Sequence, residues 1–300
     1  MKIIKNSNTK YNLPICLALG FFDGVHLGHR TIIEKSIAKA NELGVGFEHE
    51  VKSGVLTFSN NPLPESKLIY TFHDRLVLFE SLKLDCCFHF ELDKRWKSMN
   101  ANQFLEFLIA NFNIHAFICG VDYRFGKDSS GDVEHLKKFA YERGIDVEVI
   151  SQQLFEKGKK ISSTIIRKCI QSGEIEKANA LLGDNYFMKG EVVKGHQKGR
   201  KMGLPTLNLN IMPDIVQLKE GVYRTETTFD EKKYSSLTHI GKNKTFNSDD
   251  ITCETHVLNH DLGELYSKEI KVEFISRLRD TIKFNSPEKL ANYIKTIDMQ

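Results

Sequence analysis

No stretch of the chain is apolar for long enough to span a membrane, although 41% of its 300 residues are hydrophobic. An excess of one charge is also missing, because 42 Lys and Arg stand against 39 Asp and Glu, a formal net charge of +3. With a mean hydropathy of -0.33, these values argue against an integral membrane protein. They also give no broad field of the kind that nucleic-acid-binding proteins use. We therefore expect neither a membrane nor a nucleic acid among the partners.

The six cysteines form no Cys-x-x-Cys pair and no zinc-ligand spacing. The N-terminal segment MKIIKNSNTKYNLP has neither the apolar stretch nor the small-residue cleavage site of a signal peptide. No internal repeat or low-complexity segment is visible. The cysteine spacing and the lack of a signal-peptide pattern predict free thiols in a reducing compartment, the cytoplasm.

Through the first half of the chain, short apolar runs alternate with segments of helical periodicity. The expected strands are Ile15–Gly20, Ser53–Phe58, Cys86–Leu92, His115–Gly120 and Ile145–Ile150. The expected helices are Arg30–Leu43, His73–Leu82, Asn102–Phe112, Asp132–Arg143 (capped by Asp132) and Ser162–Leu182, which Gly183 should end. Such alternation predicts an α/β domain with a doubly wound parallel sheet.

The pattern changes near residue 183, after which short runs of strand character follow one another between Gly, Asn and Asp turns. These runs are Phe187–Lys194, Gly221–Phe229, Tyr234–Ile240, Thr252–Asn259 and Ile270–Ile275. Their spacing is typical of an antiparallel barrel or sandwich. A last helix is expected over Pro287–Ile297, with Ser286 as its cap. We therefore expect two domains, residues 1–185 and 186–300.

The densest chemical signal is GFFDGVHLGH, which lies between the first expected strand and its helix, where an open parallel sheet binds ligands. Gly20 and Gly24 allow close backbone approach to a phosphate, and the helix N-terminus supplies amide donors. His26 and His29 can point at a single α-phosphate and stabilise the charge that builds on its oxygens. Exposed loop histidines or metal ligands are the alternatives, but no third ligand stands at a suitable spacing. The motif predicts a phosphate site.

A second run, ISSTIIR, places hydroxyls at a helix start and an arginine one turn later. Such hydroxyls normally cap the helix, and such an arginine normally faces solvent. In the functional alternative, Ser163, Thr164 and Arg167 close over the β- and γ-phosphates, because an arginine fork suits a departing pyrophosphate. From these residues alone, neither interpretation is favoured.

The loop GHQKGRKMGLPTLN combines glycines with basic side chains. Gly195, Gly199 and Gly203 can let backbone amides wrap a polyphosphate. Thr206 and Asn208 offer hard oxygen ligands to a Mg²⁺ ion that keeps several waters. A basic surface hairpin is the plainer alternative. The loop is not a Walker A motif, because no GK[ST] follows its glycines at the required distance.

Two residues of the later strands are further candidates. Glu254, in TCETH, can accept the proton of an attacking hydroxyl, although a strand glutamate more often faces solvent or forms an ion pair. Arg279, in RLRD, can stack on an aromatic ligand ring.

Together the motifs resemble a known family. GFFDGVHLGH, the TFxxxP pattern of Thr57, Phe58 and Pro62, GVDYRFG and ISSTIIR resemble the adenylyltransferase module of bacterial bifunctional riboflavin kinase/FAD synthetases. GHQKGRKMGLPTLNL, GVY, HIGKNKTF, CETHVL and RLRDTIKF are similar, in the family's order, to motifs of the riboflavin kinase barrel.

The resemblance implies a Rossmann-like nucleotidyltransferase domain, followed by a smaller antiparallel β-barrel with a C-terminal helix. It implies an enzyme that phosphorylates riboflavin to FMN and then joins AMP from ATP to FMN, giving FAD and pyrophosphate. ATP, riboflavin and FMN would be the substrates and Mg²⁺ the cofactor. The implied site residues are His26, His29 and Arg167 for adenylyl transfer; Gly20, Asp23, Gly24, Ser163, Thr164, Gly195, Gly199 and Gly203 for ATP; Asp122 and Arg279 for flavin; Thr206 and Asn208 for the metal; and Glu254 as the base for the riboflavin 5′-hydroxyl.

Several positions depart from the family's pattern, and four of them bear on activity. Phe21 replaces the usual Asn, Ser129 an Arg, Lys244 a Pro and Thr281 a Glu. They motivate an alternative, a paralogue with one or both sites silent that binds a flavin or nucleotide. An adenylyltransferase for another acceptor, such as a phosphopantetheine or nicotinamide nucleotide, is a third hypothesis, against which the C-terminal motifs speak.

Overall fold

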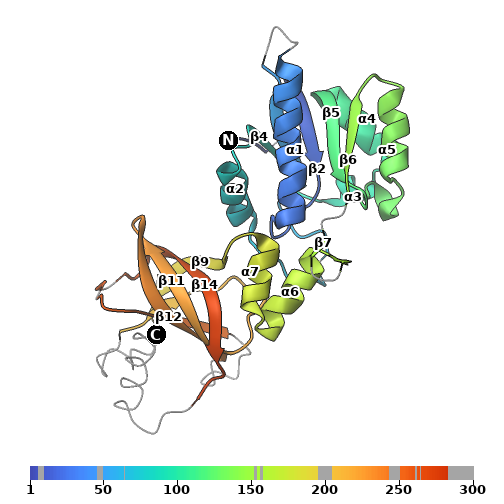
Figure 1. Cartoon of the computed structure of the whole chain (residues 1–300). Coiled ribbons are helices and arrows are strands. Elements are labelled where there is room, and N and C mark those ends of the chain that lie inside the picture. The colour runs from blue at the N-terminus through green and yellow to red at the C-terminus, as the bar shows by residue number, and fades with distance from the viewer. Residues whose placement is uncertain are drawn as a thin grey trace. The chain divides into compact units, whose positions relative to one another are not determined.

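The computed structural model describes residues 1–5, 10–45, 50–63, 65–151, 154–155, 158–194, 205–242, 251–260, 262–263 and 265–282. By their internal contacts they form two compact units, Met1–Ser163 and Thr164–Gln300 (Figure 1).

The first unit is built on a parallel six-stranded sheet with the strand order β1-β4-β3-β2-β5-β6. The strands are β1 (Lys2–Ile4), β2 (Tyr11–Leu19), β3 (Lys52–Phe58), β4 (Cys86–Phe90), β5 (Phe112–Gly120) and β6 (Asp146–Ile150). The helices are α1 (Leu27–Gly44), α2 (Phe72–Ser81), α3 (Lys94–Ser98), α4 (Ala101–Asn111) and α5 (Val133–Tyr141), with a 3-10 turn η1 (Lys127–Ser129) and a hairpin of β7 (Leu154–Phe155) and β8 (Lys159–Lys160). The predicted doubly wound sheet is confirmed.

Both faces of this sheet are buried, because successive side chains of a strand point to opposite sides. In β2, Ile15 and Leu17 belong to the hydrophobic core that includes α4 and α5. Cys16 and Ala18 of the same strand belong to the core that includes Ile33 of α1. Helices therefore cover both faces, which explains why the strands are continuous apolar runs in the sequence.

The single helix predicted over Ser162–Leu182 is wrong. The segment forms two helices, α6 (Ser163–Ser172) and α7 (Ile175–Leu182), separated at Gly173. Gly173 has a φ of +82°, and a Cβ atom there would lie 2.6 Å from Cδ of Arg277. A left-handed glycine ends a helix, and Gly183, with a φ of +79°, ends α7 in the same way, as predicted. Asp132 caps α5, also as predicted, by accepting the His135 amide at 2.9 Å.

The second unit contains a closed antiparallel barrel with the strand order β10-β13-β12-β11-β14-β9, which confirms the barrel prediction. Its strands are β9 (Tyr186–Val193), β10 (Leu207–Leu209), β11 (Gly221–Phe229), β12 (Lys232–Lys242), β13 (Ile251–Val257) and β14 (Glu269–Arg279). Inward residues alternate with outward ones, so that the rings of Tyr223 and Phe274 meet in the interior at 5.4 Å. The helix predicted over Pro287–Ile297 lies outside the described residues.

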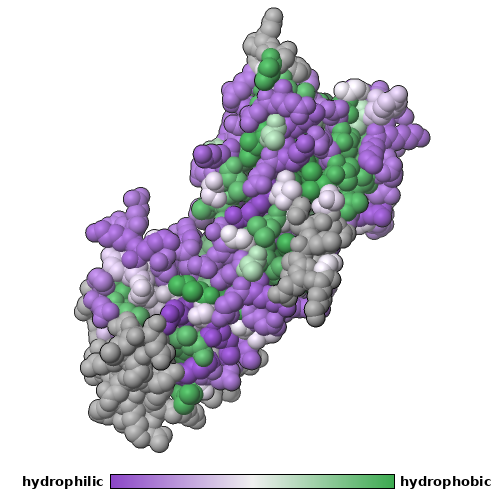
Figure 2. Space-filling model, viewed as in Figure 1, coloured by the Kyte–Doolittle hydropathy of each residue, from purple (hydrophilic) through white to green (hydrophobic). Residues whose placement is uncertain are grey.

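Among the helices of the described segments, none is both long and apolar enough to cross a membrane. Figure 2 shows hydrophilic residues over much of the outward surface of α1. This amphipathic helix therefore buries one side on the sheet and leaves the other to water.

Candidate active sites

The turn that joins β2 to α1 is tightly folded. Phe22, Gly24 and Val25 have φ angles of +57°, +86° and +41°. Gly20 is required at its start, because a Cβ atom there would lie 2.8 Å from the ring of Phe22. Residues other than glycine rarely adopt a positive φ. Where they do, the backbone is strained, and such residues are often found at functional sites. The turn sits at the carboxyl edge of the parallel sheet and leads directly into α1, which begins at the histidine pair.

The two histidines lie against each other at the N-terminus of α1. His26 is the N-cap, and its Nδ1 accepts the amide of His29 at 3.3 Å. Because Nδ1 accepts, the neutral ring carries its proton on Nε2, which can donate to a ligand. The His29 ring stacks on it, with centroids 3.5 Å apart and planes inclined by 16°. Nδ1 of His29 is buried and has no hydrogen-bond partner among the described residues.

Both imidazoles are neutral near pH 7. Burial lowers the pKa of His26 to about 4, and the charge of Lys160 also lowers it. Burial likewise holds the pKa of His29 well below its ordinary value, together with the charge that His26 carries once it is protonated and the charges of Arg75 and Lys160. A helix N-terminus with two cations nearby is an electropositive place that suits a phosphate.

Neutral buried imidazoles predict that acid destabilises the first unit. A histidine of the unfolded chain titrates near pH 6.5, whereas His26 takes up its proton only near pH 4. Between these values the unfolded state binds more protons, so stability is lost as the pH falls from about 6.5 toward 4. We expect His26 alone to lower the free energy of unfolding by about 1–2 kcal/mol between pH 7 and pH 5.

Urea unfolding followed by tryptophan fluorescence measures this loss, because the single tryptophan, Trp96, is buried in the first unit. The variant His26→Asn keeps a capping side chain and should lose less stability over the same pH range. An equal loss in the variant and the wild type would contradict the assignment.

Two further predicted residues meet at the β2–α1 turn. The carboxylate of Asp23 accepts the amides of Ile69 at 3.0 Å and Tyr70 at 3.4 Å, which fixes the loop before α2. The carbonyl of Asp23 accepts the hydroxyl of Ser163 at 2.8 Å. The start of ISSTIIR is thus joined to the FDG turn. Thr164 and Arg167 belong to the second unit, and their contact with ATP stays a prediction.

Lys160 is a site residue that the sequence did not indicate. It forms an ion pair with Asp122, the predicted flavin contact at the end of β5. The charges of Lys160 and Asp122 shift the pKa of His26 in opposite directions, so both lie near that imidazole. A lysine in a short Lys-Lys strand carries no pattern that separates it from other surface lysines, and only the folded contact identifies it.

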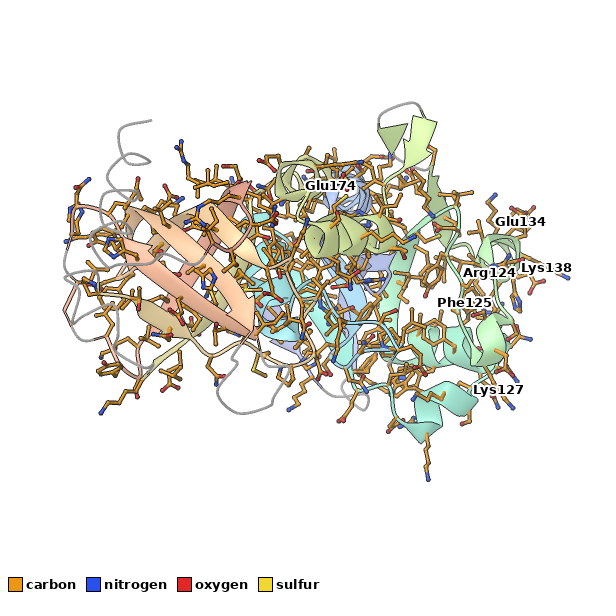
Figure 3. The ribbon with its side chains drawn as sticks, turned by 90° about the horizontal axis from the view of Figure 1, so that it is seen from below. Arg124, Phe125, Lys127, Glu134, Lys138 and Glu174 are labelled. Atoms are coloured by element: carbon orange, nitrogen blue, oxygen red, sulfur yellow. The ribbon has the colours of Figure 1, made fainter. Side chains whose placement is uncertain are left out.

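The rest of the GVDYRFG motif packs beside α5. Phe125 forms an isolated antiparallel bridge with Gly131, and Arg124 pairs with Asp132 at 3.3 Å. Figure 3 shows Arg124 and Phe125 at the same end of the first unit as Glu134 and Lys138 of α5. Ser129 lies in the turn between Phe125 and Gly131 and has a φ of +56°. These contacts fix the C-terminal part of the GVDYRFG motif, and Asp122 belongs to its N-terminal part.

In the barrel, the predicted second-site residues form one row across neighbouring strands. Asn208 of β10 lies opposite Glu254 of β13, which in turn lies opposite His239 of β12. His239 faces Val222 of β11, and Val222 faces Arg279 of β14. Residues directly opposite each other project to the same face of a sheet. Asn208, Glu254 and Arg279, three of the predicted residues, therefore share the outer face of the barrel.

The ETH motif also holds the segment before β10. His256, two residues after Glu254, lies with Nδ1 2.9 Å from the carbonyl oxygen of Pro205, to which it donates. This bond fixes the backbone next to Thr206. A threonine hydroxyl, the Asn208 amide oxygen and a neighbouring carboxylate form the oxygen donor set that Mg²⁺ prefers. The predicted ATP contacts Gly195, Gly199 and Gly203, and also Lys244, lie outside the described residues.

His239 is the member of this row that sequence reasoning missed. Its Nε2 lies 3.2 Å from Oγ1 of Thr281, one of the positions that depart from the family's pattern. A single histidine on a strand gives no signal by itself, and the pairing with Glu254 becomes visible only from the barrel register.

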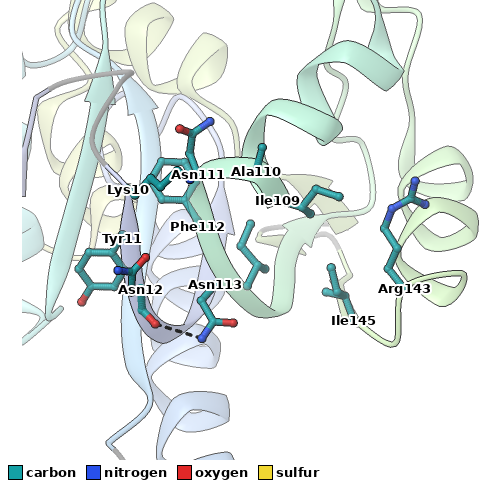
Figure 4. Close-up of a pocket in the computed structure, with 11 residues that line it drawn as sticks. Lys10, Tyr11, Asn12, Ile109, Ala110, Asn111, Phe112, Asn113, Arg143 and Ile145 are labelled. Carbon is teal, nitrogen blue, oxygen red and sulfur yellow. Dashed lines mark hydrogen bonds between the residues drawn. The ribbon is translucent and has the colours of Figure 1, made fainter.

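A pocket of about 570 Å³ lies in the first unit at the amino-terminal ends of β2 and β5, the opposite edge from the histidines (Figure 4). Two of the polar side chains that line it form contacts within the first unit. Arg143 pairs with Glu106 at 2.6 Å, and the side-chain amide of Asn113 donates to the carbonyl of Asn12 at 3.1 Å. None of the predicted site residues lines it.

A parallel sheet with a strained glycine turn and two stacked imidazoles at its carboxyl edge defines a nucleotide-binding domain of the nucleotidyltransferase class, and a closed barrel follows it in the chain. The family model described as FAD synthetase matches residues 8–165, and the model described as riboflavin kinase matches residues 182–299. The chain belongs to the bifunctional riboflavin kinase/FMN adenylyltransferase family. The predicted domain border at residues 185/186 stays a prediction; most of α6 and of α7 lies between the two family matches.

Curated relatives carry that same name. The protein of Buchnera aphidicola subsp. Schizaphis graminum is 31% identical, over 98% of this chain and 96% of its own. Those of Listeria monocytogenes and Bacillus subtilis are each 30% identical and cover 91% and 93% of this chain, and 87% and 89% of their own. A crystal structure described as a macrolide-efflux protein from Streptococcus pneumoniae has a TM-score of 0.87 at 26% identity, over 99% of this chain and 97% of its own.

Proposed function

We propose that this chain converts riboflavin to FAD in two ATP-dependent steps at two separate sites. In the first step, the riboflavin 5′-hydroxyl oxygen attacks the γ-phosphorus of ATP, giving FMN and ADP. In the second, a phosphate oxygen of FMN attacks the α-phosphorus of another ATP, giving FAD and pyrophosphate. The observation that carries the second step is the stacked His26–His29 pair at the start of α1, with a buried ring nitrogen that has no hydrogen-bond partner among the described residues.

The adenylyl-transfer site works by position and charge. Nε2 of His26 and the ring of His29 bind the α-phosphate oxygens, on which negative charge accumulates as the bond to pyrophosphate breaks. Lys160 and the amides at the start of α1 add positive potential. Ser163, Thr164 and Arg167 contact the leaving pyrophosphate. In this mechanism the bound substrates are held with the attacking and leaving oxygens in line, and no nucleophilic side chain is needed.

The kinase site uses the outer row of the barrel. Glu254 accepts the proton of the riboflavin hydroxyl as the new O–P bond forms. Thr206 and Asn208 would hold Mg²⁺, whose charge offsets that of the ATP phosphates when it is bound. Arg279, at the other end of the row, stacks on the flavin ring. The pairing of Asn208 with Glu254 supports this assignment, because it brings the metal position beside the base.

The described residues also support a cytoplasmic enzyme with small-molecule partners. All six cysteines are buried and free, which suits a reducing compartment where ATP is abundant. The near-balanced charge suits small anionic substrates better than nucleic acid. The relatives named above are enzymes, so they do not favour a silent paralogue.

The function is tested with the purified chain, riboflavin, ATP and Mg²⁺, with FMN and FAD separated by chromatography. We expect FMN to form first and FAD to follow, and FAD to form alone when FMN replaces riboflavin. Omission of Mg²⁺ should stop FMN formation. Binding of flavin and ATP without either product would favour the silent paralogue and overturn the proposal.

A further inference from the structure

Arg75 of α2 is a buried cation that the reaction described above does not use. Its side chain is 0% exposed. Nη1 donates to the carbonyl of Phe21 at 2.7 Å and to the hydroxyl of Thr57 at 3.1 Å, and Nη2 donates to the carbonyl of Phe58 at 2.9 Å. All of these acceptors are neutral. The charge of Asp23 raises the pKa of Arg75 but offsets only part of the cost of burial, so the presence of this arginine calls for a compensating role.

The acceptors of Arg75 come from two segments that form the edge of the nucleotide site. Phe21 opens the strained turn whose next residues have positive φ and which ends at His26. Thr57 and Phe58 end β3 and belong to the TFxxxP motif, and the Thr57 hydroxyl itself donates to the Phe21 carbonyl at 2.9 Å. A strained turn persists only where its surroundings fix it. One guanidinium thus holds the turn against the end of the neighbouring strand.

The charge of Arg75 also reaches the histidines. Burial lowers the pKa of Arg75 to about 10, so the guanidinium stays charged at neutral pH. The rings of Phe21 and Phe72 lie 4.5 Å and 5.3 Å from it and shield it from water. The permanently charged side chains that act on His29 are Arg75 and Lys160, and each of them favours the neutral form of the His29 ring, as does a proton on His26.

We propose that Arg75 is a positioning residue for adenylyl transfer, which fixes the turn that aims the histidine pair and supplies a permanent positive charge close to the triphosphate. The inference rests on the proposed adenylyl-transfer function of the first unit. A point charge alone would fill only the second of these roles. The ammonium group of a lysine supplies the charge, but it cannot donate to two carbonyls and a hydroxyl in the fixed fork of arginine, so it would not fix the turn in the same way.

Two variants of the full chain separate the two roles. In Arg75→Met both the fork and the charge are lost, and kcat/KM for FAD formation from FMN should fall by about 100-fold, mostly through kcat. In Arg75→Lys the charge remains, and the loss should be about tenfold. The acid limb of the pH profile should move to higher pH in Arg75→Met, because His29 loses a cation that favours its neutral form, and should stay in place in Arg75→Lys.

Riboflavin kinase activity of the same samples reports on the chain as a whole, and Trp96 fluorescence reports on the folding of the first unit. Arg143→Met is the matched control, because Arg143 lies at the opposite edge of the sheet and should leave FAD formation unchanged. If the Met variant does not fold, the Lys variant decides alone: a wild-type rate of FAD formation overturns the inference.

Wild-type FAD formation in Arg75→Met, or an equal displacement of the acid limb in both variants, would also overturn it. A wild-type chain that forms no FAD from FMN would instead defeat the proposed function itself. The two failures are therefore distinguishable.

Discussion

Replacing His29 by asparagine is expected to lower the rate of FAD formation from FMN by about 1,000-fold, while FMN formation from riboflavin continues at the wild-type rate. The ring of His29 stacks on His26 and presents a buried nitrogen without a partner among the residues the structure describes. A preorganised donor of this kind contributes chiefly where charge develops in the transition state, so kcat should fall more than KM rises.

The measurement follows both products from a single preparation, with FMN supplied for one reaction and riboflavin for the other. His73→Asn is the matched control, because His73 is exposed on α2 in the same unit and should leave both rates unchanged. Loss of both activities in His29→Asn would show that the chain, and not one site, was damaged. Undiminished FAD formation would remove the histidine pair from the mechanism.

Local patterns predicted that His26 and His29 lie together at a helix start, because these residues follow one another closely in the chain. A strand, a glycine turn and a helix start place His26 and His29 together within four positions of sequence. The fold class also followed from local alternation, since buried parallel strands and covering helices have different periods. Asp132 as a helix cap is predicted for the same reason.

Contacts between distant segments escaped prediction. Arg75 meets Phe21 and Phe58 only after α2 has packed on the sheet, and in the sequence it is one helical arginine among others. The positive φ of Gly173 breaks the helix, and the side chain of Arg277, far away in the sequence, fills the space that a Cβ atom there would need. The sequence of a helical segment contains no sign of that neighbour. The row of Glu254 and His239 likewise depends on a strand register that spacing alone does not determine.

Glu254→Gln is expected to lower the rate of FMN formation by about 1,000-fold and to leave FAD formation from supplied FMN unchanged. The amide keeps the size and the hydrogen-bonding shape of the carboxyl group but does not accept the proton of the 5′-hydroxyl. The position of Glu254 beside Asn208 should be retained, because strand pairing between β10 and β13 sets it. Binding of ATP and riboflavin, followed by calorimetry, should therefore change little while turnover is lost.

Glu226→Gln provides the matched control. Glu226 lies on the outer face of β11 in a surface ion pair with Lys233 at 2.6 Å, and such pairs contribute little to stability.

Mixing His29→Asn with Glu254→Gln gives a second readout. FMN released by the first variant is the substrate of the second, so the mixture should make FAD from riboflavin although neither variant does so alone. FMN formation by Glu254→Gln at the wild-type rate would assign the base to another residue of the barrel. A mixture that makes FMN but no FAD would mean that FMN does not pass through solution between the two sites.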